Sequence, residues 1–245
     1  MQADKVVGVD GCRCGWIAAS YSPQSSSFSF SLHQSFAALL DEHRSAISIG
    51  VDIPIGLSES FTPRNCDRRA RELIGPRRSS VFPAPDRRIL KLAPYAAANT
   101  FAREECDKGI SQQCFHIMPK IAEVDGIMTS KVQARIFEVH PEVCFWAASG
   151  RVTLMHSTRT LEGYEERCSI LRKAFPHANF AALPGKRPEI VWQTLHVTSR
   201  EVQPDDILDA MIAAWTALRH SRNEHSRIPD TAEYDPRGLR MEIVF

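Results

Sequence analysis

The segment ILDAMIAAWTALRH, at 207–220, constrains the fold of this chain more than any other. Pro204, Asp205 and Asp206 precede it and favour a helix start, because a first turn accepts proline and the helix dipole favours acids there. The helix would be apolar or alanine on most of its faces. Such a helix must be buried against a sheet, so we expect an α/β core with this helix packed across it.

Short apolar runs supply the strands of that sheet. We expect strands in KVVGVD, GWIAASY and FSFSLH, at 5–10, 15–21 and 28–33, with Gly11 as a turn signal and SPQSSS as a hairpin loop. SFAALLDEHR, at 35–44, has apolar residues at helical spacing behind a serine that can cap them. A β-branched run from Ile47 to Ile55 follows as the fourth strand. The predicted order is therefore strand, strand, strand, helix, strand.

A helical insertion is expected at about 62–130. Thr62 and Pro63 are suited to start a helix, with a hydroxyl at the cap and proline in the first turn, and Gly75 is suited to stop it. Further along, Pro94 and Pro119 should divide the chain into several short helices rather than one rod.

The remaining third of the chain returns to mixed patterns. ARIFEVHPEVCFW at 134–146 is β-rich, RTLEGYEERCSILRKAF at 159–175 is helical, and EIVWQTLHV at 189–197 is a strand or a loop. We expect one domain over residues 1–220 that contains the insertion, followed by a C-terminal tail at 221–245 in which residues 221–240 are polar and irregular.

Charge and cysteine usage limit the class of protein. Thirty basic residues against 29 acidic ones give a net charge of +1, so the field of the whole molecule would not by itself hold a polyanion. Seven scattered cysteines, behind a start that lacks the layout of a signal peptide, indicate free thiols in a reducing cytoplasm. No apolar run approaches the roughly 20 residues that cross a bilayer, so we expect no membrane partner. Cys12 and Cys14 are spaced more tightly than a usual zinc knuckle, which favours two small side chains after a strand over a zinc site.

Acidic residues stand at three places on elements that should be central. Asp10 ends the first strand, Asp52 ends the fourth in the run VDIPIG, and Asp206 and Asp209 lie in the first turns of the last helix. An i, i+3 pair lies on one helix face, so the last two can point at one spot. Strand ends and helix starts meet at the usual place for a site in an open α/β sheet. We therefore expect these carboxylates to cluster.

Each acid also has a simpler role when it is taken alone. Asp205 is suited to cap the helix, and an aspartate at a strand end is a common turn former. The conjunction favours a site, because buried carboxylates are costly without cations. Clustered carboxylates without histidine or cysteine ligands suit Mg²⁺ or Mn²⁺. We therefore predict that Asp52 is a metal ligand at a strand tip and that Pro54 ends the ladder behind it.

Basic residues supply candidates for holding a substrate. Arg64, Arg68 and Arg71 lie at helical spacing on one face of the predicted helix, and Lys120 and Lys131 follow later in the chain. A solvated helix face with an internal ion pair between Asp67 and Arg71 explains the arginines equally well. A phosphate-binding patch and an ordinary surface therefore both stay open for this segment.

Five motifs in order resemble the domain-of-unknown-function family 429, whose members are described as predicted nucleases of the RNase H fold. They are GVDGCRCGW at 8–16, VDIPIGL at 51–57, RNCDRRAR with GPRRSSVFPAP within 64–85, FEVHPE at 137–142 and DDILDA at 205–210. The resemblance spans the chain from Gly8 to about Leu218. It implies an α/β fold with an RNase H-like mixed sheet flanked by helices, and the strand order predicted above is also that of RNase H-like domains.

The resemblance also implies a set of site residues. The pattern of Asp206, Asp209, Ala210 and Ala214 is similar to the last acidic pair of Holliday-junction resolvases. By that likeness the catalytic and metal-binding residues are Asp10, Asp52, Asp206 and Asp209, with Glu138 as a fifth ligand and with His140 and Glu142 as supporting neighbours. An ordinary strand-end charge explains Glu138 equally well.

The predicted function is phosphodiester hydrolysis by two divalent ions, Mg²⁺ or Mn²⁺, with DNA or RNA as the partner. Two other classes stay open. A non-catalytic member could use the same acidic pocket to bind structured nucleic acid or a protein. An actin-like ATP-handling enzyme would share the sheet and the aspartate of the first strand. Such enzymes need a flexible phosphate loop after that aspartate, where this chain has one glycine and a bulky arginine.

Overall fold

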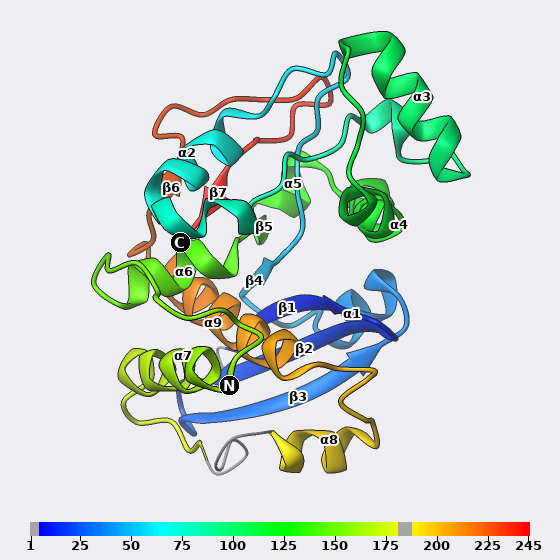
Figure 1. The fold of residues 1–245 in the computed structure, drawn as a ribbon. Helices are drawn as coiled ribbons and strands as arrows, with labels where there is room; N and C mark the ends of the chain where they lie inside the picture. Colours follow the sequence, from blue (N-terminus) through cyan, green and yellow to red (C-terminus); the bar gives the residue numbers. More distant parts are fainter. Residues whose placement is uncertain (1–4, 181–187) are drawn as a thin grey trace.

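A computed structural model describes residues 5–180 and 188–245 (Figure 1). Within these residues a five-stranded sheet has the order β3-β2-β1-β4-β5. Its strands are β1 (Val6–Cys12), β2 (Gly15–Ser22), β3 (Ser27–His33), β4 (Ser48–Val51) and β5 (Ile136–Glu138). β2 runs antiparallel to β1 and β3, whereas β1, β4 and β5 are parallel. The predicted mixed sheet is therefore confirmed.

Helices flank this sheet, and most of them lie between β4 and β5 or after β5. They are α1 (Phe36–Glu42), α2 (Asn65–Ile74), α3 (Tyr95–Cys106), α4 (Gln112–Ile127), α5 (Ser130–Gln133), α6 (Pro141–Ala148), α7 (Leu161–Ala174), α8 (Glu189–Leu195) and α9 (Pro204–Ser221), with the short 3₁₀ helices η1 (Gly75–Ser80) and η2 (Arg87–Ile89). In Figure 1 the segment between β4 and β5 lies above the sheet, with α3 and α4 at its outer end.

Side-chain alternation divides the core into two buried clusters, one on each face of the sheet. On β1, Val6 and Cys12 belong to the cluster that contains α9, whereas Val7 and Val9 belong to the cluster that contains residues of α1 and α4. Successive side chains of a strand point to opposite faces. Asp10 therefore points to the face that α9 covers.

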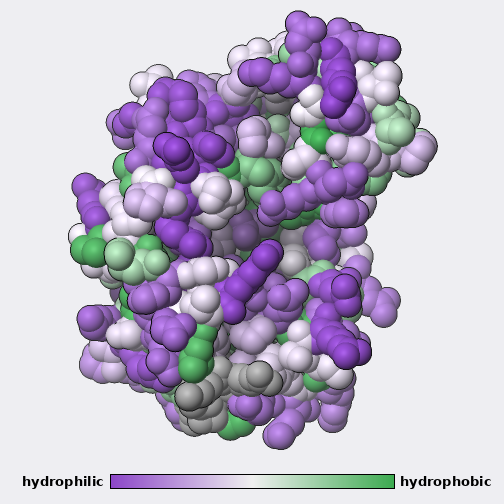
Figure 2. Space-filling view, in the orientation of Figure 1, coloured by the Kyte–Doolittle hydropathy of each residue, from purple (hydrophilic) through white to green (hydrophobic). Residues whose placement is uncertain are grey.

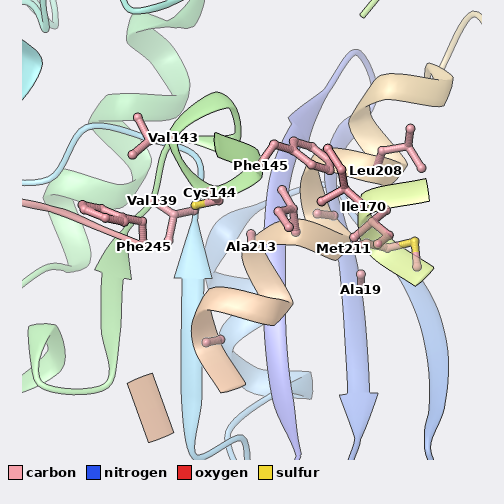
Figure 3. Close-up of a cluster of buried hydrophobic side chains, with 14 of the residues drawn as sticks. Ala19, Val139, Val143, Cys144, Phe145, Ile170, Leu208, Met211, Ala213 and Phe245 are labelled. Carbon is pink, nitrogen blue, oxygen red and sulfur yellow. The ribbon is translucent and has the colours of Figure 1, made fainter. Parts of the chain in front are cut away.

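The helix predicted to cross the sheet, α9, packs directly on the middle strands. A Cβ atom on Gly8 of β1 would lie 2.0 Å from the carbonyl oxygen of Ala210 and 2.1 Å from the amide nitrogen of Ala214. Only glycine allows the helix backbone to come this close to the strand. Figure 3 shows Ala213 and Met211 of α9 among apolar side chains of α6, α7 and β2. This contact fixes the start of α9 beside the end of β1.

Several predicted boundaries were wrong. β1 continues through Gly11, which pairs with Trp16 of β2 and leaves room for the side chain of Lys120 rather than making a turn. α2 begins at Asn65, two residues later than the Thr62-Pro63 start, with Arg64 at its N-cap position. Pro119 lies inside α4 and does not divide it.

Two segments are more helical than the sequence predicted. The β-rich composition at 134–146 yields only β5, because Pro141 takes the first position of α6, where a missing amide proton costs no hydrogen bond. The segment at 189–197 forms α8, which buries Val191 and ends at His196 in a left-handed conformation. Apolar composition alone does not separate a short buried helix from a strand.

The C-terminal segment, 221–245, packs against the core. Its strands β6 (Arg227–Ile228) and β7 (Ile243–Val244) pair with each other, and Val244 forms a bridge to Val139. The final residue, Phe245, is buried against Trp146. None of the helices in the described part of the chain has the length and apolarity to span a membrane.

Candidate functional site

Neighbouring strands bring two of the predicted aspartates together. Asp10 lies near the carboxyl end of β1, and Asp52 directly follows β4, the parallel neighbour of β1. The amide of Asp52 donates a hydrogen bond to the carbonyl of Val9 over 2.9 Å. Gly50 faces Ala213 of α9, so alternation turns the side chain of Asp52 to the same face as that of Asp10.

The first turns of α9 supply the other two aspartates. Gln203 occupies the N-cap position that the sequence had offered to Asp205, and a carboxylate oxygen of Asp206 accepts the amide hydrogen of Gln203 over 2.7 Å. This reciprocal cap is the capping box. Asp209 follows one turn later. The carboxylate of Asp206 therefore accepts a hydrogen bond within the helix cap, whereas the carboxylate of Asp209 takes no part in the cap.

The electrostatics of Asp10 place the four aspartates in one neighbourhood. Burial raises the pKa of Asp10 well above its ordinary value, and repulsion from Asp52, Asp206 and Asp209 raises it further. The amide of Gly11, which donates to Asp10 over 2.7 Å, acts in the opposite direction. Side chains from β1, β4 and α9 are thus close enough to destabilise one another's charge.

The other three aspartates have raised pKa values as well. Burial and repulsion from Glu138 raise the pKa of Asp52 to about 8. Burial raises the pKa of Asp206 to about 7, although the amide of Gln203 and the ammonium of Lys120 oppose the shift. The pKa of Asp209 is raised by burial and by Asp52, and Arg167 opposes it.

The cluster is short of cations. Among the described residues, no ion pair includes Asp10, Asp52, Asp206 or Asp209, and no protein hydrogen bond reaches the carboxylates of Asp52 and Asp209. Within the same residues no three of these carboxylates bring their oxygens within 4.8 Å of one another. Asp10 is buried, and Asp52, Asp206 and Asp209 are partly buried. Carboxylate oxygens without protein partners are the donor set that hard divalent ions prefer, so the residues fit Mg²⁺ or Mn²⁺.

Glu138, the fifth predicted ligand, lies in a buried ion pair. Its two carboxylate oxygens each accept a hydrogen bond from Arg64 over 2.7 Å, and one of them also accepts the amide hydrogen of Ile55 over 2.7 Å. Arg64 also contacts Asp67. The pair ties β5 to the segment that follows β4, so the oxygens of Glu138 are engaged with protein groups.

The predicted arginine face separates into three different environments. Arg64 is buried in the pair with Glu138, Arg68 is exposed and pairs with Glu72, and Arg71 donates to the carbonyl of Val81 over 2.6 Å. The alternative pair between Asp67 and Arg71 does not form, because Asp67 contacts Arg64. Of the three, only Arg68 is exposed to solvent.

The two predicted lysines lie at opposite ends of the sheet. The ammonium of Lys120 donates to the carbonyl of Gly15 over 2.5 Å, lies 4.6 Å from the ring centroid of Trp16, and lowers the pKa of Asp206. Lys131 is exposed on α5, which precedes the amino end of β5. Lys120 therefore borders the aspartates, whereas Lys131 lies near the amino end of β5, away from the strand ends that carry Asp10 and Asp52.

A pocket of about 250 Å³ opens beside Asp52 and Asp209. It is also lined by Arg77, His140 and Glu142. Arg77 and the buried Arg167 both donate to one oxygen of Glu142, while its other oxygen has no partner among the described residues. On the face drawn in Figure 2, hydrophilic side chains surround a hollow near the centre of the molecule.

Arg167 and the ion pair between Arg77 and Glu142 could not be found from the sequence. Arg77 and Glu142 are 65 positions apart in the chain, and Glu142 and Arg167 are 25 positions apart. No local spacing reveals such a contact. The proline at the start of α6, which places Glu142 in the first turn of a buried helix, is the one local signal.

The comparison with protein families identifies the chain. The sequence model of the family described as "Protein of unknown function (DUF429)" matches residues 8–234. The chain belongs to this family. Neither a curated protein nor a solved structure matches it. The match runs from Gly8 within β1 to beyond β6 and includes all four aspartates.

Proposed function

We propose that this DUF429 protein is a metal-dependent nuclease of the RNase H-like class that hydrolyses phosphodiesters in DNA or RNA. The observation that carries the proposal is the crowding of Asp10, Asp52, Asp206 and Asp209 on the α9 face of the sheet, where no described protein cation pairs with them. The order of three antiparallel strands, a helix and parallel strands supports the RNase H-like class. Fold likeness alone does not carry an activity, whereas the four aspartates offer the ligands that the reaction needs.

The four aspartates would hold the divalent ions, and Asp206 would share its carboxylate with the helix cap. Bound Mg²⁺ or Mn²⁺ would stabilise the negative charge on the attacking and leaving oxygens of a phosphodiester. Lys120, fixed by the carbonyl of Gly15 and the ring of Trp16, sets a positive charge at the border of the cluster. Arg77 offers a second positive charge in the adjacent pocket.

Protons compete with metal for the same oxygens. The pKa values of about 8 for Asp52 and about 7 for Asp206 mean that the metal-free site is partly protonated near neutral pH. Metal binding requires the ionised carboxylates and therefore releases these protons. We expect the apparent metal affinity to rise as the pH rises from about 6 to 9, because proton competition falls over the titration range of Asp52 and Asp206.

The direct test combines Mn²⁺ titration with cleavage assays on single-stranded DNA, duplex DNA, RNA, hybrid and junction substrates. Wild type should bind Mn²⁺ and cleave at least one of these, and Asp52→Asn should lose both properties. Asp230→Asn, an exposed acid after β6, is the matched control and should keep both. Wild-type protein that binds no Mn²⁺ and cleaves none of these substrates would contradict the proposal.

A non-catalytic binding role is the second candidate. It is favoured by the spacing of the carboxylates, since no three of them converge within 4.8 Å in the described residues. A protein of this kind would bind nucleic acid or a protein partner without turnover, and neither Mn²⁺ nor a single Asp52→Asn change would alter that binding. Nucleic-acid binding measured with and without Mn²⁺ separates the two candidates.

A further inference from the structure

A second group of ligand side chains lies at the edge of the sheet, on the face away from α9. Ser31 and His33 are on the edge strand β3, opposite Ala18 and Trp16 of β2, whose side chains belong to the cluster on the α1 face. Glu42 is the last residue of α1, and His43 is its C-cap. Strand β3 and helix α1 thus bring four polar side chains to one place.

Their ligand atoms converge on one point. The Nε2 atoms of His33 and His43 lie 2.9 Å and 3.1 Å from the hydroxyl oxygen of Ser31. One carboxylate oxygen of Glu42 lies 3.9 Å from Nε2 of His33, and the other lies 4.0 Å from Nε2 of His43. In residues 5–180 and 188–245 this is the one group of three histidine, cysteine or acidic residues whose ligand atoms all lie within 4.8 Å.

Hydrogen bonds to Ser31 leave one ring nitrogen of this group without a partner. The hydroxyl of Ser31 can donate to one imidazole and accept the Nε2 hydrogen of the other. His43 is 2% exposed, and its Nδ1 atom has no hydrogen-bond partner in the described residues. Burial lowers the pKa of His43 to about 4 and lowers that of His33 too, although Glu42 opposes both shifts and Lys5 adds to the first. The neutral imidazole is the form that binds metal.

We propose that His33, His43 and Glu42 bind one Zn²⁺ ion, with the hydroxyl of Ser31 or a water molecule as the fourth ligand. Imidazole and carboxylate donors suit Zn²⁺, whereas Mg²⁺ prefers oxygen ligands alone. Tetrahedral zinc with ligands at 2.0–2.1 Å places ligand atoms about 3.3 Å apart. Each imidazole Nε2 lies close to this distance from the hydroxyl oxygen of Ser31. The carboxylate of Glu42, whose side chain is 55% exposed, lies farther out and would have to move inward to bind the ion.

This site would fasten the end of α1 to the edge strand. It is separate from the aspartates, because Asp10 and Asp52 face α9 on the other side of the sheet. The proposal therefore does not depend on the nuclease proposal.

The test is a Zn²⁺ titration of the untagged full chain by calorimetry, in excess Mg²⁺ so that the aspartates are saturated. Wild type should bind one equivalent of Zn²⁺ and melt at a higher temperature when it is bound. Co²⁺ at the same place should give the visible absorption of a tetrahedral ion. Glu42→Gln should weaken Zn²⁺ binding by more than the roughly 10–100-fold that loss of an outer partner costs.

Asp41→Asn, which removes the neighbouring exposed acid on α1, is the matched control and should bind Zn²⁺ as wild type does. His43→Gln should abolish binding, and the exposed Glu42→Gln keeps the test valid if the His43 variant fails to fold. Wild type that takes up no Zn²⁺ in excess Mg²⁺, or equal uptake by wild type and Glu42→Gln, would overturn the proposal.

Discussion

Two groups of acids lie close together in this protein, and only one of them is paired with arginines. Glu138 and Asp67 share the buried guanidinium of Arg64, and Glu142 accepts from Arg77 and Arg167. Asp52 and Asp209, which border the same pocket, receive no hydrogen bond from any described residue. The fold thus pairs the acids that connect its elements with arginines and leaves the acids of the cluster without an ion pair among the described residues.

The largest expected effect is on the paired group. Arg64→Met leaves Glu138 and Asp67 buried without their cation, and breaking a buried pair costs about 3–5 kcal/mol. We expect that loss in the free energy of unfolding, measured by urea denaturation. Adding Glu138→Gln should restore part of it. A loss below about 1 kcal/mol would show that the two groups do not differ in this way.

The second expected effect is on the contact that holds the cluster together. Gly8→Ala places a methyl group against the backbone of α9, and overpacking of this kind costs about 1–3 kcal/mol. Because α9 must move away from β1, Mn²⁺ affinity should fall as well. Gly126→Ala in α4, where an added Cβ meets nothing within 4 Å, is the control and should stabilise the protein by about 0.5–1 kcal/mol. Unchanged Mn²⁺ affinity in Gly8→Ala would show that the close packing of α9 on β1 is not needed for metal binding.

The third expected effect is a change in the pH dependence of stability. The folded state raises the pKa of Asp52 from 3.8 to about 8, so it binds the proton more tightly than the unfolded state does. Metal-free stability should therefore fall as the pH rises from about 4 to 8. Asp52→Asn should reduce that slope by at most about 1.4 kcal/mol per pH unit. Thermal unfolding in chelator at a series of pH values measures this slope. If Asp52→Asn left the slope unchanged, the folded state would not raise the pKa of Asp52.

The smallest effect is expected at the surface. Arg68→Ala removes an exposed pair with Glu72, which should change the free energy of unfolding by less than about 1 kcal/mol. If Arg68 holds nucleic acid, the same change should weaken binding and reduce its salt dependence. Binding titrations at two salt concentrations decide between the substrate contact and the solvated face.

The sequence predicted the sheet well because its strands carry local signals. The runs that became β2 and β3, the serine cap of α1, and the buried character of α9 all depend on residues close together in the chain. The short segments were harder. Pro141 and Val191 lie in helices that apolar composition made look like strand or loop.

The residues of the candidate site also differ in whether a local sequence signal reveals them. Asp10, Asp52, Asp206 and Asp209 could be chosen from the sequence because strand ends and helix starts are local, and the structure brings them close enough to raise one another's pKa. Their role in metal binding stays a prediction. The partner of Glu138 could not be chosen, because Arg64 lies 74 residues away in the chain. Pairing across such a distance is set by the packed fold.

The capping box of α9 gives the site a built-in reporter. One carboxylate oxygen of Asp206 holds the amide hydrogen of Gln203, at an exposed position where the chain enters the helix. An ion that drew this oxygen away would release that hydrogen to solvent. The exchange rate of a single amide would then register occupancy of the acidic cluster, in a protein for which no substrate needs to be known.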